Sequence, residues 1–263
     1  MVSDIVHGMV SKIGVAAIVI TCIVALAVAI GLGVYATRAS AVSAPDPPLE
    51  IARPHCPPVL TPTSSRSMLS QSPQLETIAL FLTEAEADAV IELASDRFQR
   101  SHVVEEKTGV QHPDPSRTSH SVYLKYGETP LVKEIEARAA AVANIPRENL
   151  ERLQVVRYEF GQFYKSHFDY LPITDDVTMY GQRQATLFVY LNDLPTQETG
   201  GGTHFETLKK TIRPKKGTAA FWMNMTPDGN VDPRTLHGGE TIQMPGTVKY
   251  GMNIWFRTKA QPR

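Results

Sequence analysis

Ala185-Thr-Leu-Phe-Val-Tyr-Leu191 is a short run of β-branched and aromatic residues. Such residues favour β-strands because their side chains pack well on a pleated surface. Similar runs occupy 153–160 (LQVVRYEF), 219–223 (AAFWM) and 250–256 (YGMNIWF), and turn signals such as Lys216-Gly and Pro245-Gly separate them. Several short strands with little helix between them favour a jelly roll over a βαβ fold.

Two helices are expected before these strands. Thr83-Glu-Ala-Glu86 forms a capping box, and apolar residues follow at helical spacing as far as Phe98. Pro130 follows Thr129 and is suited to the first turn of a second helix, which should end near Asn144. We therefore predict a mainly β fold with flanking α (α+β), in which N-terminal helices pack on a double-stranded β-helix (jelly roll) core.

The chain divides into four regions. Residues 1–12 form a short N-terminal tail, residues 13–36 an uncharged apolar segment, residues 37–72 a Pro/Ser-rich stalk, and residues 73–263 the folded domain. About two dozen apolar residues are enough to cross a bilayer as a helix, and the apolar core of a cleavable signal peptide is normally shorter. We expect a type II transmembrane signal anchor, although small residues after position 38 leave cleavage open.

Charge and cysteine content exclude some classes of protein. The 26 Lys and Arg residues nearly balance the 27 Asp and Glu residues, and no basic block suggests nucleic acid. Only Cys22 and Cys56 are present, so no disulfide framework holds the domain. Asn224-Met-Thr is a glycosylation sequon whose use stays open, as does the oligomeric state.

His167-Phe-Asp169 points to a metal centre. A His-x-Asp pair on an extended strand places both side chains on one face. With His237 arriving from a distant strand, these residues would complete a 2-His-1-carboxylate triad, which leaves open positions on a non-haem iron(II) ion for O2. Each piece alone is a weak signal, since most single His-x-Asp pairs are incidental.

A cation follows the triad at Lys249, which opens the last apolar strand. A dicarboxylate cosubstrate needs a positive group for its far carboxylate, and lysine is a compact point charge. Tyr158 and Tyr190 could add hydroxyl hydrogen bonds. Taken alone, each of these residues is better interpreted as a strand-end lysine or a core tyrosine.

Ten short sequence motifs, which include the residues named above, occur in a fixed order over more than half of the chain. They are RTS (117–119), LQVVRY (153–158), GQFYKSHFDY (161–170), GQR (181–183), ATLFVYLN (185–192), GGTHF (201–205), PKKG (214–217), FW (221–222), DGNVDPRTLHGG (228–239) and KYGMNIW (249–255). Together they resemble the catalytic domain of prolyl 4-hydroxylases, which are iron(II)/2-oxoglutarate dioxygenases. The apolar segment and stalk also resemble the type II members of the secretory pathway.

The resemblance implies an activity and a set of site residues. It implies hydroxylation of proline in proline-rich peptides or proteins, coupled to decarboxylation of 2-oxoglutarate to succinate and CO2, with Fe(II), O2 and ascorbate. It also implies placement in the endoplasmic reticulum or Golgi membrane with a lumenal catalytic domain. The implied residues are His167, Asp169 and His237 for iron, Lys249, Tyr158, Thr186 and Tyr190 for 2-oxoglutarate, and Tyr164, Arg117, Glu151, Arg183 and Trp255 for the peptide.

The chain also departs from the family pattern. Twelve positions separate His237 from Lys249, where ten is usual, and Arg257 stands where some members carry histidine. The second difference leaves the substrate open. The alternatives are a dioxygenase of the same family with a non-prolyl substrate, a zinc hydrolase using the same triad, and a catalytically silent jelly-roll binding module.

Overall fold

The computed structural model describes residues 65–105 and 108–263. Its helical segments are α2 (Glu84–Ala94), α3 (Pro130–Ala143), α4 (Asp175–Tyr180) and the 3-10 turns η2 (Ser95–Arg97), η3 (Arg147–Asn149), η4 (Gln197–Thr199) and η5 (Pro233–Thr235). Its strands are β1 (Arg66–Gln71), β2 (Gln74–Ile78), β3 (Gln99–Arg100), β4 (His102–Val104), β5 (Gln111–Pro113), β6 (His120–Tyr123), β7 (Gln154–Tyr158), β8 (Tyr164–His167), β9 (Arg183–Tyr190), β10 (Thr203–Phe205), β11 (Lys210–Ile212), β12 (Ala219–Met223), β13 (His237–Gly239) and β14 (Lys249–Arg257).

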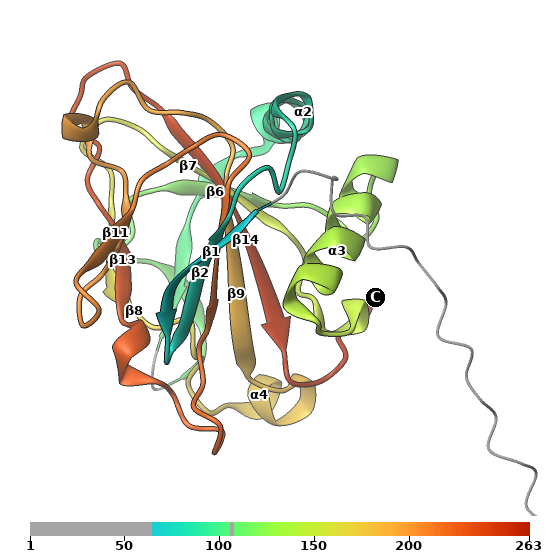
Figure 1. The fold of residues 1–263 in the computed structure, drawn as a ribbon. Coiled ribbons are helices and arrows are strands. Elements are labelled where there is room, and N and C mark those ends of the chain that lie inside the picture. The colour runs from blue at the N-terminus through green and yellow to red at the C-terminus, as the bar shows by residue number, and fades with distance from the viewer. Residues whose placement is uncertain (1–64, 106–107) are drawn as a thin grey trace, which may run out of the picture. The chain divides into compact units, whose positions relative to one another are not determined.

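Two antiparallel sheets face each other. The larger has the order β1-β2-β12-β9-β14-β7-β6-β3, and the smaller has the order β11-β10-β13-β8. Helices α2 and α3 cover the face of the larger sheet that points away from the smaller one (Figure 1). This arrangement confirms the predicted jelly roll with helices packed on it.

Alternating side chains of the central strands build two separate cores. In β9, Leu187 and Val189 belong to the core beneath the helices, whereas Phe188 and Tyr190 belong to the core between the sheets. The side chains alternate in this way because successive residues of a strand point to opposite faces of the sheet, and both faces of this part of the sheet are buried. The space between the sheets therefore receives every second residue of β9.

The same alternation places functional residues of β14. Met252, Ile254 and Phe256 join the core beneath the helices. Lys249 and Trp255 lie at odd-numbered positions of the same strand and consequently point toward the smaller sheet, where both line one cavity. One strand thus contributes to the core on one face and to the site on the other.

The predicted starts of both helices and the predicted end of the second are confirmed, whereas the helical spacing that runs to Phe98 is interrupted after Ala94 by the 3-10 turn η2. The Thr83 hydroxyl accepts a hydrogen bond from the Glu86 amide while the Glu86 carboxylate accepts one from the Thr83 amide, which is the predicted capping box. Helix α3 begins at Pro130 and ends at Ala143, and Asn144, the capping residue after it, has a left-handed backbone. Asparagine tolerates that conformation better than most residues, which accounts for the helix end.

The predicted start of the folded domain at residue 73 is too late. Strand β1 pairs with β2 from Arg66 onward, so at least seven residues assigned to the stalk belong to the domain. Most side chains of this edge strand are exposed, so it lacks the apolar alternation that marks a strand in sequence.

No helix within residues 65–105 and 108–263 has the length and apolar character of a membrane span. The segment predicted as an anchor lies outside these residues.

Candidate metal centre and substrate groove

Three potential metal ligands converge between the sheets. Strands β8 and β13 pair in a register that sets His167 directly opposite His237. The Nε2 atom of His167 lies 3.8 Å from Asp169 Oδ1, and Nε2 of His237 lies 3.7 Å from Asp169 Oδ2. One donor atom from each residue lies within 4.8 Å of the other two. Two imidazoles and one carboxylate at this spacing fit a ferrous ion that keeps further positions open.

Asp169 reaches the cluster from outside a strand. Strand β8 ends at His167, so the expectation that His-x-Asp lies entirely on a strand is wrong for the aspartate. The aspartate sits in the bend that follows, and its carboxylate is buried. Burial tends to raise the pKa of Asp169, but His237, His167 and Arg183 hold it below its usual value. The residue therefore stays a carboxylate, the form that binds a cation.

Both histidines are held in the tautomer that a metal requires. Nδ1 of His167 lies 2.8 Å from the Lys165 carbonyl, and Nδ1 of His237 lies 2.8 Å from the Thr235 carbonyl. A carbonyl only accepts, so each Nδ1 must donate, and in the neutral ring this leaves Nε2 unprotonated and facing the centre. Burial lowers the pKa of His167 to about 3, which keeps its ring neutral.

Thr186 supports the carboxylate of the cluster. Its hydroxyl donates to Asp169 Oδ2 at 2.7 Å and accepts from Asn224 Nδ2 at 2.9 Å. The predicted contribution of Thr186 to a cosubstrate carboxylate beside Lys249 does not fit this position.

The glycosylation sequon at Asn224 is buried. Asn224 is 1% exposed and its amide nitrogen donates to Thr186, so the sequon is not accessible in the folded domain.

We expect Thr186→Val to weaken metal binding. The substitution keeps the shape of the side chain but removes the hydroxyl that orients Asp169. Supporting residues of this kind typically contribute about tenfold to a hundredfold to metal affinity. Titration of the purified protein with Mn(II) in a calorimeter measures the change. Thr186→Ser is the matched control and should bind like the parent, whereas unchanged affinity in the valine variant would contradict the orienting role.

A buried lysine occupies the floor of the same cavity. Lys249 is 2% exposed, and its Nζ lies 5.2 Å from the Tyr158 ring centroid and 5.3 Å from that of Phe188. No carboxylate of the described residues forms an ion pair with it. Burial lowers the pKa of Lys249 to about 7. A buried ammonium without a partner favours an anionic ligand, because an unpaired charge in an apolar site is costly.

The two predicted tyrosines differ in their surroundings. Tyr158 lines the cavity and lies opposite Lys249 in the β7–β14 pair. The Tyr190 hydroxyl instead donates to Thr203 Oγ1 at 2.8 Å, so it is not free for a ligand, although its ring lies 5.8 Å from Lys249 Nζ. Thr203 itself lines the cavity and was missed in the sequence. The only sequence signal for Thr203 is its position in the Gly-Gly-Thr-His-Phe motif.

A surface groove of about 490 Å³ leads to the three clustered ligand residues, and His167 and Asp169 are part of its lining. Tyr164 and Trp255 line both the groove and the inner cavity, so the two spaces share a wall. The Tyr164 ring stacks on His167 with centroids 3.6 Å apart, and burial raises the pKa of its hydroxyl to about 12. Phe168, which was not predicted as a site residue, also lines the groove and is 39% exposed. The approach to the cluster is therefore rich in aromatic side chains.

The predicted arginines lie in the groove, but the predicted glutamate does not. The Arg117 guanidinium lies 4.7 Å from the Tyr164 ring centroid and donates to Gln154 at 3.0 Å. Arg183 stacks on Trp255 at 3.6 Å. Glu151 lines a neighbouring cavity and holds Arg183 through two hydrogen bonds of 2.8 Å. Its position indicates that Glu151 orients Arg183 from outside the groove.

Comparisons with known proteins agree with this geometry. The model of the 2OG-Fe(II) oxygenase superfamily matches residues 153–257, which contain the three clustered ligands and Lys249. "Probable prolyl 4-hydroxylase 10" of Arabidopsis thaliana is 36% identical over 209 residues, which cover 72% of this chain and 71% of that protein. Prolyl 4-hydroxylase 1 of the same plant is 35% identical over 208 residues, with coverage of 73% and 72%.

Solved structures are also similar. A viral collagen prolyl hydroxylase from Paramecium Bursaria Chlorella virus-1, in complex with 2OG, matches with a TM-score of 0.54 and 30% sequence identity, covering 70% of this chain and 95% of that one. A Pseudomonas putida prolyl-4-hydroxylase matches with a TM-score of 0.50 at 18% identity, covering 71% and 93%. The second likeness concerns the fold alone.

Proposed function

Because this chain belongs to the prolyl 4-hydroxylase family of iron(II)- and 2-oxoglutarate-dependent oxygenases, we propose that it hydroxylates proline in proline-rich peptides or proteins lying in the groove. The reaction converts 2-oxoglutarate and O2 to succinate, CO2 and a hydroxylated product. Iron, when bound, supplies the oxygen chemistry that no protein side chain provides. The observation that carries the proposal is the wall of Tyr164 and Trp255 shared by the groove and the cavity of the triad.

The protein's own residues hold and orient the reactants. His167, Asp169 and His237 would hold the iron, since each histidine is oriented through Nδ1 with Nε2 toward the centre and the aspartate is held as a carboxylate. Lys249 would pair with the distal carboxylate of 2-oxoglutarate, with the Tyr158 hydroxyl beside it. The enclosing aromatic rings exclude water, which strengthens that ion pair. All five residues line one small cavity.

The groove suits a proline-rich segment. Polyproline II is preformed in such peptides, so binding costs little ordering entropy. Tyr164, Phe168 and Trp255 offer aromatic surfaces to pyrrolidine rings, as aromatic-lined grooves do for other proline-rich ligands. Intact triad and lysine residues argue against a silent binding module. We include ascorbate as the reductant that keeps the iron in its ferrous state.

Mass spectrometry tests this function directly. The purified protein is incubated with Fe(II), ascorbate, 2-oxoglutarate and O2, together with a proline-rich peptide or its proline-free counterpart. We expect a mass increase of one oxygen on proline, with succinate released in step. A mass increase on another residue type, or succinate release that only a non-prolyl substrate stimulates, would assign the chain to a different substrate class.

The affinity for 2-oxoglutarate is expected to fall above about pH 7. Burial lowers the pKa of Lys249 to about 7, so its cationic form is lost as the pH rises through that value. Because only the ammonium pairs with a carboxylate, the Kd should be level below pH 7 and then rise by about tenfold per pH unit. Calorimetry on the Mn(II)-loaded protein between pH 6 and 9 measures this profile. Lys249→Arg keeps its charge and should give a level profile, and a level profile in the parent would refute the prediction.

We also propose that residues 13–36 anchor the enzyme as a type II protein in the endoplasmic reticulum or Golgi membrane, with the catalytic domain in the lumen. The support is the uncharged segment, followed by a Pro/Ser-rich stretch before the domain. Protease treatment of sealed microsomes containing the full chain tests it. The domain should resist digestion until detergent is added, and digestion without detergent would contradict lumenal placement.

A further inference from the structure

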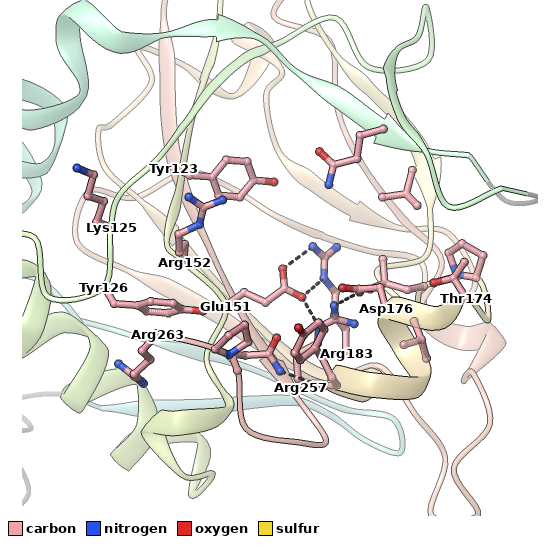
Figure 2. A pocket seen from close by; sticks show the side chains of 18 residues that line it. Tyr123, Lys125, Tyr126, Glu151, Arg152, Thr174, Asp176, Arg183, Arg257 and Arg263 are labelled. Atoms are coloured by element: carbon pink, nitrogen blue, oxygen red, sulfur yellow. Dashed lines mark hydrogen bonds and ion pairs between the residues drawn. The ribbon is translucent and has the colours of Figure 1, made fainter.

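A second cavity of about 670 Å³ adjoins the groove. Tyr123 and Arg183 line both spaces, as do Val104, Gln111, Leu171 and Pro172. The two spaces therefore meet along one wall, and an extended peptide that leaves the groove over this wall enters the cavity. Figure 2 shows the side chains that line this cavity, several of which are charged.

One side of the cavity is electrically neutral. Glu151 extends toward Arg183 and Arg257, and its carboxylate pairs with both (Figure 2). Arg257 also pairs with Asp176 and donates to the Gly181 carbonyl at 2.6 Å. Two arginines and two carboxylates thus satisfy one another. Among the described residues that line this side, no acidic group is free to attract a cationic ligand.

The opposite side of the cavity carries two cationic side chains. Lys125 and Arg152 lie there, and neither forms an ion pair with an acidic group of the described residues (Figure 2). The Arg152 guanidinium lies 5.3 Å from the Tyr123 ring centroid, a contact that holds it against the wall shared with the groove. Glu151 and Asp176 are the acidic residues among those that line the cavity, and both are already paired. The cavity therefore has a net positive field at the end of the peptide path.

We propose that this cavity is an anionic subsite, which binds an aspartate or glutamate of the peptide substrate at a fixed distance from the target proline. The proposal rests on the proposed function, because it assumes that a peptide lies in the groove. An acidic side chain entering over Tyr123 meets the cationic side of the cavity first. The subsite adds a selection for acidic flanks to the selection for proline, so it distinguishes among proline-rich sequences.

A peptide scan with charge reversal tests the subsite. Peptides keep one proline-rich core, and a single flanking position carries Glu, Gln or Lys, moved stepwise along both sides. At one position, Glu should lower the KM relative to Gln by roughly threefold to tenfold, the effect of two exposed ion pairs. The advantage should shrink in 0.5 M salt, because such pairs are screened. The double variant Lys125→Glu and Arg152→Glu should reverse the preference and favour the Lys peptide.

The controls distinguish the proposed subsite from the proposed function on which it rests. Lys210→Glu alters the charge of an exposed lysine on β11, outside both spaces, and should leave the Glu preference unchanged. Hydroxylation of every peptide with equal KM would overturn the subsite and leave the function standing. Fluorescence anisotropy of labelled peptides reads the charge preference even without turnover. Absence of hydroxylation together with a retained Glu preference would refute the function and not the subsite.

A free carboxylate is the remaining alternative occupant. The blocked amino acid N-acetyl-glutamate amide, added at millimolar concentration, should compete only weakly with a Glu-containing peptide. A peptide holds its carboxylate near the cavity at a high effective concentration, which a free molecule lacks. Equally strong inhibition of the Glu and Gln peptides would show that the additive acts elsewhere. Full loss of the Glu advantage at low concentration would assign the cavity to a small acid instead.

Discussion

Replacement of His167 or Asp169 by alanine is expected to abolish the conversion of 2-oxoglutarate to succinate. Each substitution removes one of the three donors that converge within 4.8 Å, and the two donors that remain hold a divalent ion far less tightly. We expect a loss of activity well beyond the roughly hundredfold that supporting residues of a metal site contribute. Turnover of 2-oxoglutarate and Mn(II) titration of each variant give independent measurements.

His204→Ala provides a matched control for these variants. His204 is a histidine of β10 whose Nδ1 lies 2.8 Å from the Thr211 hydroxyl, and it is not part of the cluster. Its removal should leave Mn(II) affinity close to that of the parent. Normal turnover in the His167 or Asp169 variant, with the fold intact by circular dichroism, would reject the metal assignment.

Periodicity made the central strands and both main helices predictable. Strand β12 was predicted with its observed bounds, and β9 within a few residues, because buried central strands are nearly continuous in apolar residues. Edge strand β1 escaped prediction because its side chains are mostly exposed, and the sheet forms it by backbone pairing with β2. The pattern of apolar residues predicts which side chains are buried. It does not predict which exposed segment pairs through its backbone with a neighbouring strand.

The site was predictable in its residue types more than in its contacts. His167, Asp169, His237 and Lys249 lie together as expected, although the aspartate reaches the cluster from a bend. The roles of Thr186 and Glu151 depend on partners far away in sequence, Asp169 and Arg183 respectively. Neither spacing nor composition indicates which of two nearby carboxylates or cations a side chain will contact. Sequence motifs therefore locate a centre, whereas its supporting contacts come from the packing.

Lys249→Ala is expected to raise the KM for 2-oxoglutarate by about thirtyfold or more while the KM for the peptide changes by less than about threefold. Loss of one partner of a buried charge pair typically costs about 2 kcal/mol or more, and each 1.4 kcal/mol corresponds to about tenfold. The peptide groove does not include Lys249, so its contacts remain. Steady-state kinetics with each substrate varied in turn give both constants. A larger shift in the peptide KM would show that the lysine does not anchor the cosubstrate.

Lys249→Met separates the anchoring role from a role in folding. Methionine keeps an unbranched apolar side chain among the rings of Tyr158 and Phe188 and removes only the charge. Because burial places the pKa of Lys249 near 7, below its value in the unfolded chain, the unfolded chain binds more protons at neutral pH. The lysine therefore destabilises the fold below about pH 7, and this cost fades as the pH rises. At pH 7 the methionine variant should melt at the same temperature as the parent or higher, yet show the raised KM for 2-oxoglutarate. A lower melting temperature with both KM values raised would mean that Lys249 supports the structure of the cavity and not its ligand.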